Sequence, residues 1–281
     1  MKLLFKFVPV LFLMLAINAC QKEISQDEGT VPEKVLDADA KSFLNAATIT
    51  DTTIQNAVNN LVVQLKDAAL WNKFKAIYPM VGGSASTAKW NLKDPRDTDA
   101  AFRISFRGNP VFAVTGVLFP TIQDYGDTHL YDSMLPYNSN SIAYYSRTQN
   151  KVNGYDMGCS DLYPPYNQMT IYNEHNGSGY FGFSVWAYTP ANTTGLFMLN
   201  SSVDDVMWYE NGVQKFNMQS EPHPLYTNTP FLIGWCQDVS SGGQRECGFA
   251  SISSESLSGA EALSFYNIVQ QFQTALNRQV N

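Results

Sequence analysis

The sequence predicts an all-β sandwich or barrel with one helix before it and one after it. Aromatic residues make up 13% of the 281 residues and charged residues only 15%, a composition that suits strands better than a helical bundle. Between about residues 80 and 256, apolar residues recur with a period of two, which is typical of half-buried strands. On both sides of this region the pattern changes to the period of a helix.

An export signal is predicted over residues 1–19. Lys2 and Lys6 accompany an apolar run of about 15 residues, which is too short to span a membrane comfortably. The run ends in Ile17-Asn18-Ala19-Cys20, which resembles the lipobox of bacterial lipoproteins. This resemblance implies cleavage before Cys20 and acylation of that residue, so that lipid alone anchors the chain to the outer membrane of the cell envelope. The alternative is an ordinary secretory signal whose cleavage site happens to precede a cysteine.

Residues 20–45 are predicted to be a flexible tether, because residues 21–40 are polar, acidic and aperiodic. Lys22-Glu23 resembles in part the short export signals of surface lipoproteins in Bacteroidetes, which implies display at the cell surface. The net charge of -7 argues against a nucleic-acid binder and against electrostatic adsorption to anionic lipid. Residues 46–281 are predicted to form one domain.

An amphipathic helix is predicted over residues 51–77, where apolar residues recur at steps of three and four. Asp51 is a suitable N-cap, and Pro79 follows the pattern at a point where proline stops a helix. A second helix is predicted near the C-terminus. There, Ser258 and Glu261 have the spacing of a capping box ahead of an apolar stripe.

Short strands separated by turns are predicted between the two helices. Apolar residues alternate with polar ones over residues 102–107, and a further alternating face is predicted over residues 231–235. Asn211-Gly212, flanked by two apolar runs, is a strong signal for a two-residue hairpin. Strands at a spacing of roughly ten residues, with Gly, Asn and Ser in the turns, are typical of a sandwich or barrel.

Several stretches of the chain together resemble a known family. They are residues 70–79 (LWNKFKAIYP), 81–95, 125–128 (YGDT), 141–148 (SIAYYSRT) and 265–280 (FYNIVQQFQTALNRQV). In these stretches the chain is similar to the concanavalin A-like lectin/glucanase (laminin-G-like jelly-roll) family, which occurs in lipoproteins of Bacteroidetes. The resemblance implies a jelly-roll β-sandwich over roughly residues 45–281, and it carries over no catalytic residue.

Non-catalytic carbohydrate binding is the leading function that this resemblance implies. Flat aromatic rings can stack on the apolar faces of sugars while polar neighbours bond the hydroxyl groups. The candidate ligand-binding residues are Tyr163, Tyr166, Tyr172, Trp186 and Tyr188. The alternative for each is that its ring fills the core or its rim. A structural or protein-interaction module of the cell envelope is the second hypothesis, and a glycan-cleaving enzyme is the third.

The sequence contains few signs of catalysis or of a cofactor. It lacks the alternating acids that are typical of jelly-roll glucanases. His129, His175 and His223 are far apart, and no nucleophile elbow occurs, although distant segments can still meet in a fold. Asp124 and Asp127 are weak candidates for a Ca²⁺ site at a loop rim, since acidic turn residues are also common on any surface.

Two cysteines, Cys236 and Cys247, lie on either side of a Gly-Gly loop. A cross-strand disulfide between them is one prediction, because the exported compartment permits disulfides. The alternative is that both are free cysteines buried in the sandwich. No Cys-x-x-Cys or His-Cys cluster supports a metal site.

Overall fold

The computed structural model describes residues 35–136, 139–150, 152, 154–161, 168–175, 178–181, 186–188, 192–219, 227, 229–236 and 242–280. Met1–Val35 and Leu36–Asn281 are separate units, and the features below belong to the second. The expected signal over residues 1–19, the lipidation of Cys20 and most of the expected tether lie outside the described residues. They therefore stay predictions.

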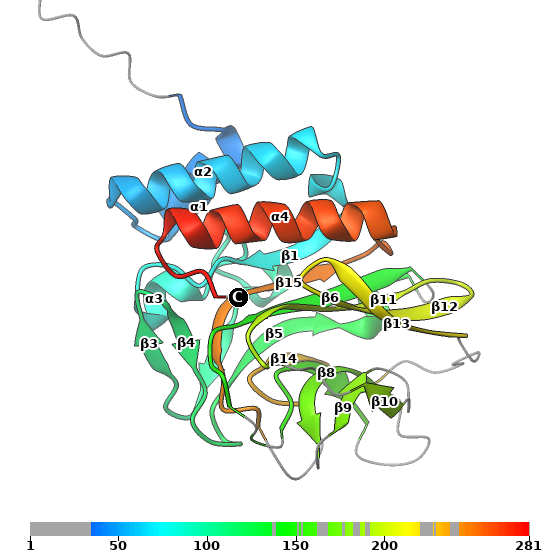
Figure 1. Ribbon diagram of the computed structural model, residues 1–281. Coiled ribbons are helices and arrows are strands. Elements are labelled where there is room, and N and C mark those ends of the chain that lie inside the picture. Colours follow the sequence, from blue (N-terminus) through cyan, green and yellow to red (C-terminus); the bar gives the residue numbers. More distant parts are fainter. Residues whose placement is uncertain are drawn as a thin grey trace, which may run out of the picture. The chain divides into compact units, whose positions relative to one another are not determined.

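Two antiparallel sheets form the second unit (Figure 1). Sheet A contains β1 (Phe74–Tyr78), β3 (Val111–Ala113), β4 (Gly116–Leu118), β6 (Asn140–Ser146), β11 (Gly195–Ser201), β12 (Asp205–Glu210), β13 (Val213–Gln219) and β15 (Glu246–Ser253). Its strand order is β13-β12-β11-β6-β15-β4-β3, and β1 also pairs with β15. Sheet B contains β2 (Ser105–Arg107), β5 (Tyr125–Tyr131), β7 (Met157–Ser160), β8 (Gln168–His175), β9 (Ser178–Phe181), β10 (Trp186–Tyr188) and β14 (Pro230–Ile233). Its order is β10-β9-β8-β7-β14-β5-β2. The predicted β-sandwich with flanking helices is thus confirmed.

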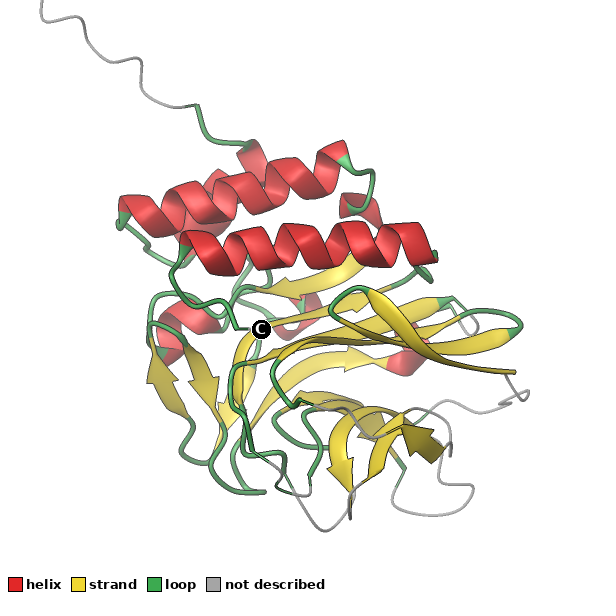
Figure 2. Ribbon diagram, viewed as in Figure 1, coloured by secondary structure: helices red, strands yellow, loops and turns green. Residues whose placement is uncertain are grey.

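Helices cover the face of sheet A that is turned away from sheet B (Figure 2). The helices are α1 (Ala38–Ala46), α2 (Thr52–Asp67), α3 (Ala85–Ala88) and α4 (Gly259–Ala275), with short 3-10 helices η1 (Trp71–Lys73), η2 (Asp99–Ala101) and η3 (Asp132–Met134). Of these, α1, α2 and α4 form the helical layer. Two predicted caps are confirmed: Asp51 accepts a hydrogen bond from the amide of Ile54, and Ser258 and Glu261 form a capping box.

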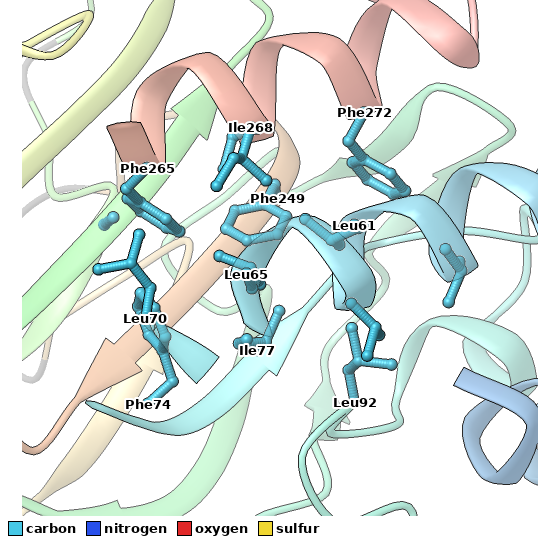
Figure 3. Close-up of a cluster of buried hydrophobic side chains, with 14 of the residues drawn as sticks. Leu61, Leu65, Leu70, Phe74, Ile77, Leu92, Phe249, Phe265, Ile268 and Phe272 are labelled. Atoms are coloured by element: carbon cyan, nitrogen blue, oxygen red, sulfur yellow. The ribbon is translucent and has the colours of Figure 1, made fainter. Parts of the chain in front are cut away.

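Sheet A has a hydrophobic core on each of its faces. Ala143 and Tyr145 of β6 belong to the core beneath the helices, and Ile142 and Tyr144 belong to the core between the sheets. Every residue of β6 is therefore buried, which explains why its middle, residues 142–145, is a continuous apolar run rather than an alternating one. Figure 3 shows the helix-side core, where Phe265 and Phe272 of α4 point toward β1 and β15.

The first predicted helix ends earlier than expected, and the prediction of a helix over its last residues, 68–77, is wrong. The helix α2 stops at Asp67, Ala69 takes a left-handed φ of 57°, and residues 74–78 form strand β1. Phe74 and Ile77 stand three residues apart, so they fit a helical stripe as well as a buried strand. Pairing of β1 with β15 decides between the two, since tertiary context overrides a weak local preference.

The predicted tether is too long at its C-terminal end. Residues 38–46 form helix α1, whose Phe43 and Leu44 are buried in the helix-side core. Asp37 caps this helix through the amide of Asp39 and also forms an ion pair with Lys66 at 2.8 Å. Residues 21–40 are acidic on the whole, but Ala40, Phe43 and Leu44 have the three- and four-residue spacing of one helix face.

The predicted hairpin at Asn211-Gly212 is confirmed. Both residues have positive φ, 50° and 75°, as a two-residue type I′ turn requires. The cysteine alternatives are also resolved among the described residues. Cys236 and Cys247 are buried thiols and form no disulfide.

Candidate functional site

The outer face of sheet B carries partly exposed polar and aromatic side chains. Strand β5 alternates strictly: Gly126, Thr128 and Leu130 are buried, whereas Tyr125, Asp127, His129 and Tyr131 are partly exposed. This face is not covered by the helical layer, which packs on sheet A (Figure 2). The outer face of β5 in sheet B can therefore present side chains to a ligand.

A β-bulge in β5 places His129 in an unusual backbone conformation. Tyr131 pairs with Pro230 and Asp127 with Leu232, so β5 has two more residues than β14 between these pairs. His129 has a φ of 57°, a region that non-glycine residues seldom adopt. Its amide donates to Asp127 Oδ1 at 2.8 Å. Such strained positions cluster at functional sites.

Thr128 completes the bulge from the buried side. Its hydroxyl donates to the carbonyl of Phe231 at 2.7 Å and accepts from the amide of Leu130 at 3.2 Å. The side chains of Asp127 and Thr128 therefore partner amides that the bulge removes from the regular strand ladder. The local sequence Asp-Thr-His thus builds the bulge and presents the imidazole at once.

Side chains from three segments meet at His129. Ser105 Oγ of β2 lies 2.8 Å from His129 Nε2, and Asp99 Oδ1 of η2 lies 3.5 Å from the same nitrogen. Asp127 Oδ1 lies 3.7 Å from His129 Nδ1. Arg103 donates to Asp99 Oδ1 at 2.9 Å. These five residues are named the His129 cluster below.

Two aromatic rings lie beside this cluster. Tyr125 precedes Asp127 by two residues on the same face, which places the two about 7 Å apart along the strand. Its ring packs against Trp235 with centroids 5.1 Å apart, and both residues are partly exposed. In the described part of the chain, Trp235 Nε1 is buried without a hydrogen-bond partner. The face therefore combines an aromatic pair with a polar cluster.

Of the five predicted aromatic ligand residues, only Tyr172 has a described side chain. It is 3% exposed and packs on Tyr155 with ring centroids 4.5 Å apart, so its burial does not support a stacking role. Tyr172 pairs with Tyr180 of β9, and Tyr180 pairs with Trp186 of β10, so the three positions form one row across the strands. Tyr188 is in the same strand, and the predictions for Tyr163 and Tyr166 lie outside the described residues.

The two weak Ca²⁺ candidates do not fit a metal site. Asp124 is buried and accepts from the amides of Asn109 and Thr121 and from the Thr121 hydroxyl, at 2.6, 2.9 and 2.7 Å. Burial acts to raise the pKa of Asp124, but these hydrogen bonds outweigh it and hold the pKa below its usual value. Asp127 accepts from the amide of His129. In the described ranges, no three His, Cys, Asp or Glu side chains are grouped to hold a metal ion.

A fully buried ion pair joins loops at the edge of the sandwich. Arg245 Nη1 lies 3.0 Å from Asp156 Oδ1, and both side chains are 0% exposed. Arg245 Nη2 also donates to the carbonyl of Val152 at 2.8 Å. Asp156 further accepts from the amide of Gly234 through its main-chain carbonyl at 2.7 Å. Since Gly234 precedes Trp235, the ion pair between Asp156 and Arg245 supports the backbone next to the rings of Tyr125 and Trp235.

A separate open pocket of about 360 Å³ lies beside the end of α2. It is lined by Asp39, Lys66, Ala69, Trp71 and Asn72. Near it, the ammonium group of Lys93 lies 3.7 Å from the centroid of the Trp71 ring. Burial lowers the pKa of Lys93 to about 8. This amine is therefore less basic than a lysine in water.

The sequence predictions missed Ser105, His129, Asp99, Arg103 and Trp235 as site residues. The alternation of β5 was the available signal, because it places Tyr125, Asp127, His129 and Tyr131 on one face. Nothing in the sequence indicates that residues 99–105 pack against that face.

The comparisons with known proteins concern the fold. The chain matches no protein-family model and no curated protein. It is similar to Trypanosoma rangeli sialidase in complex with 2,3-difluoro-KDN, at 9% identity and a TM-score of 0.50, covering 75% of this chain and 39% of that one. It is also similar to domain 4 of AbnA, a GH43 extracellular arabinanase from Geobacillus stearothermophilus, in complex with arabinotriose, at 15% identity and a TM-score of 0.49, covering 69% and 98%. The chain thus spans about two fifths of the sialidase, and at such identities the likeness shows a β-sandwich fold.

Among the described residues, no helix combines the length and the apolar character that crossing a bilayer requires.

Proposed function

We propose that this chain is a carbohydrate-binding envelope protein, and that sugars bind on the outer face of sheet B near β2 and β5. The single observation that carries the proposal is the pairing of Tyr125 and Trp235 beside the His129 cluster. Sugars have apolar C–H faces and polar hydroxyl groups, so they need both kinds of partner within a few ångströms. Together these side chains offer carboxylate acceptors, guanidinium donors, an imidazole and a hydroxyl.

The fold likeness is consistent with this function without indicating a ligand. A sandwich of this kind occurs in a sialidase, and fold alone does not imply function. We also propose that the chain belongs to the concanavalin A-like family that its sequence resembles. The row of positions Tyr172, Tyr180 and Trp186 lies across the other half of sheet B, and Trp186 is the candidate there for a second aromatic contact.

Glycan-array binding followed by calorimetry tests the proposal. The variant Tyr125→Ala should weaken the affinity for a bound glycan about tenfold, as the loss of one aromatic contact of about 1.4 kcal/mol requires. The matched control is Tyr266→Ala, because Tyr266 is also a partly exposed tyrosine but lies on α4 in the helical layer. Equal losses in both variants, or silence across a broad array, would contradict the proposal. Silence would favour the second hypothesis, a protein-interaction module.

We further propose that Cys20 carries the lipid anchor and that the domain is attached to the outer membrane at the cell surface. The sequence Ile17-Asn18-Ala19-Cys20 supports this. The variant Cys20→Ala should move the protein from the membrane fraction to the soluble fraction. Retention of Cys20→Ala in the membrane fraction would refute lipid anchoring, and protease treatment of intact cells would test surface display.

A further inference from the structure

We propose that the His129 cluster is also a serine esterase site, with Ser105 as nucleophile and carboxylic esters as the substrate class. An ester such as an O-acyl group on a carbohydrate presents an electrophilic carbon beside an alcohol leaving group. This activity uses the same face as the proposed binding function. It does not depend on carbohydrate binding, since a simple ester can react without it.

The geometry of nucleophile and base carries the proposal. A serine hydroxyl becomes a nucleophile when an imidazole nitrogen within hydrogen-bond reach takes its proton. Ser105 Oγ lies 2.8 Å from His129 Nε2. The two residues come from neighbouring strands, because Ser105 pairs with Asp127 across β2 and β5. Both are partly exposed, so an ester can reach the hydroxyl from the open face.

A carboxylate on the other side of the ring can position the base. For Nε2 to accept a proton, the neutral imidazole must carry its hydrogen on Nδ1. Asp127 Oδ1 lies 3.7 Å from Nδ1, which is longer than a hydrogen bond, and the two attract as an ion pair only once the imidazole has taken up the proton. Catalytic hydrogen bonds are commonly long before substrate binds. Asp127 is therefore a positioning residue. It also stabilises the bulge, through the His129 amide, that sets the direction of the imidazole ring.

A second carboxylate competes for Nε2, and a cation restrains it. Asp99 Oδ1 lies 3.5 Å from Nε2, but the same oxygen accepts from Arg103 at 2.9 Å. Arg103 Nε is buried without a hydrogen bond among the described residues, and it forms an ion pair with Asp97 Oδ1 at 3.4 Å. Arg103 thereby holds Asp99 in place and offsets part of its negative charge beside the imidazole.

The reaction balances without any further reagent than water. Ser105 Oγ bonds to the acyl carbon while its proton passes to His129 Nε2, and the acyl carbon–oxygen bond to the alcohol breaks as the alcohol takes that proton. Water then attacks the acyl-serine with His129 as base. The bond from the acyl carbon to Ser105 Oγ breaks, Ser105 regains a proton, and a carboxylic acid leaves.

Two measurements on the exported protein test this activity. In the first, a fluorophosphonate probe is incubated with the protein, and tryptic peptides are examined by mass spectrometry. We expect the phosphonyl group on Ser105 and nowhere else among the serines. In the second, hydrolysis of p-nitrophenyl acetate is followed. Ser105→Ala and His129→Gln should each lower turnover about 100-fold or more, and the double variant should be no slower than either.

Controls separate chemistry from folding. Asp127→Asn keeps an oxygen that can accept the His129 amide but removes the charge, so turnover should fall while the melting temperature holds. The matched control Ser86→Ala removes an exposed hydroxyl on α3 and should leave turnover unchanged. The proposal is overturned if Ser105 stays unlabelled, or if Ser105→Ala retains turnover that His129→Gln loses. Failure of glycan binding alone would overturn only the proposed binding function.

Discussion

Removal of one partner from the buried ion pair between Asp156 and Arg245 should be among the most damaging single changes in the molecule. Both side chains are 0% exposed, and Arg245 Nη1 lies 3.0 and 3.2 Å from the two oxygens of Asp156. Asp156→Ala would leave the guanidinium buried without its counter-charge. Such a loss typically costs about 3–5 kcal/mol, a large share of the roughly 5–15 kcal/mol that stabilises a domain.

Urea denaturation followed by tryptophan fluorescence measures this cost directly. Asp156→Asn gives a milder variant if Asp156→Ala does not fold, because its amide oxygen can still accept from Arg245. The control is Asp94→Ala, which breaks the solvent-exposed pair between Asp94 and Arg96 and should move the urea midpoint much less. If Asp156→Ala shifted the midpoint no more than Asp94→Ala, the buried charge would not be costly and the reasoning would fail.

Three further predictions concern stability and reactivity. Gly212→Ala should lower the free energy of unfolding by at least about 1 kcal/mol in thermal melts, because a Cβ there would meet Tyr266 Cβ at 2.9 Å at a positive φ. Burial lowers the pKa of Lys93 to about 8, so between pH 8 and 10.5 the unfolded chain binds that proton more tightly than the folded chain does. The free energy of unfolding of the wild type, relative to that of Lys93→Met, should therefore rise with pH over this range in urea melts. A difference that does not change with pH would contradict the prediction. Burial raises the pKa of the Cys159 and Cys247 thiols, so a thiol reagent should modify them only after unfolding.

Much of the fold was predictable because its signals are local. The hairpin at Asn211-Gly212 and the capping box at Ser258 each depend on residues within a few positions of one another, and both are confirmed. The end of the first helix was not predictable in this way. Phe74 and Ile77 satisfy either period, and only the distant strand β15 decides that residues 74–78 are a strand.

The candidate site was less predictable than the fold, because its contacts are long-range. Ser105 and His129 are 24 residues apart in sequence and meet only through the pairing of β2 with β5. The sequence pointed instead to aromatic residues after position 160, of which Tyr172 is buried against Tyr155. The sequence indicated Asp127 only as a weak Ca²⁺ ligand, whereas in the structure its carboxylate accepts a hydrogen bond from the His129 amide in the bulged strand.

The helical layer covers sheet A but not the outer face of sheet B, so the side chains that stabilise the fold differ from those that can contact a ligand. The central strands β6 and β11 of sheet A are buried on both faces, so almost any substitution in them disturbs packing. On sheet B, alternate positions of β5 lie outside both cores, and Tyr125 or Tyr131 can change without opening a cavity. New specificities can therefore arise on this face while the scaffold stays constant. Asp127 is the exception, because a substitution that removes its acceptor oxygen alters the bulge and the exposed surface together.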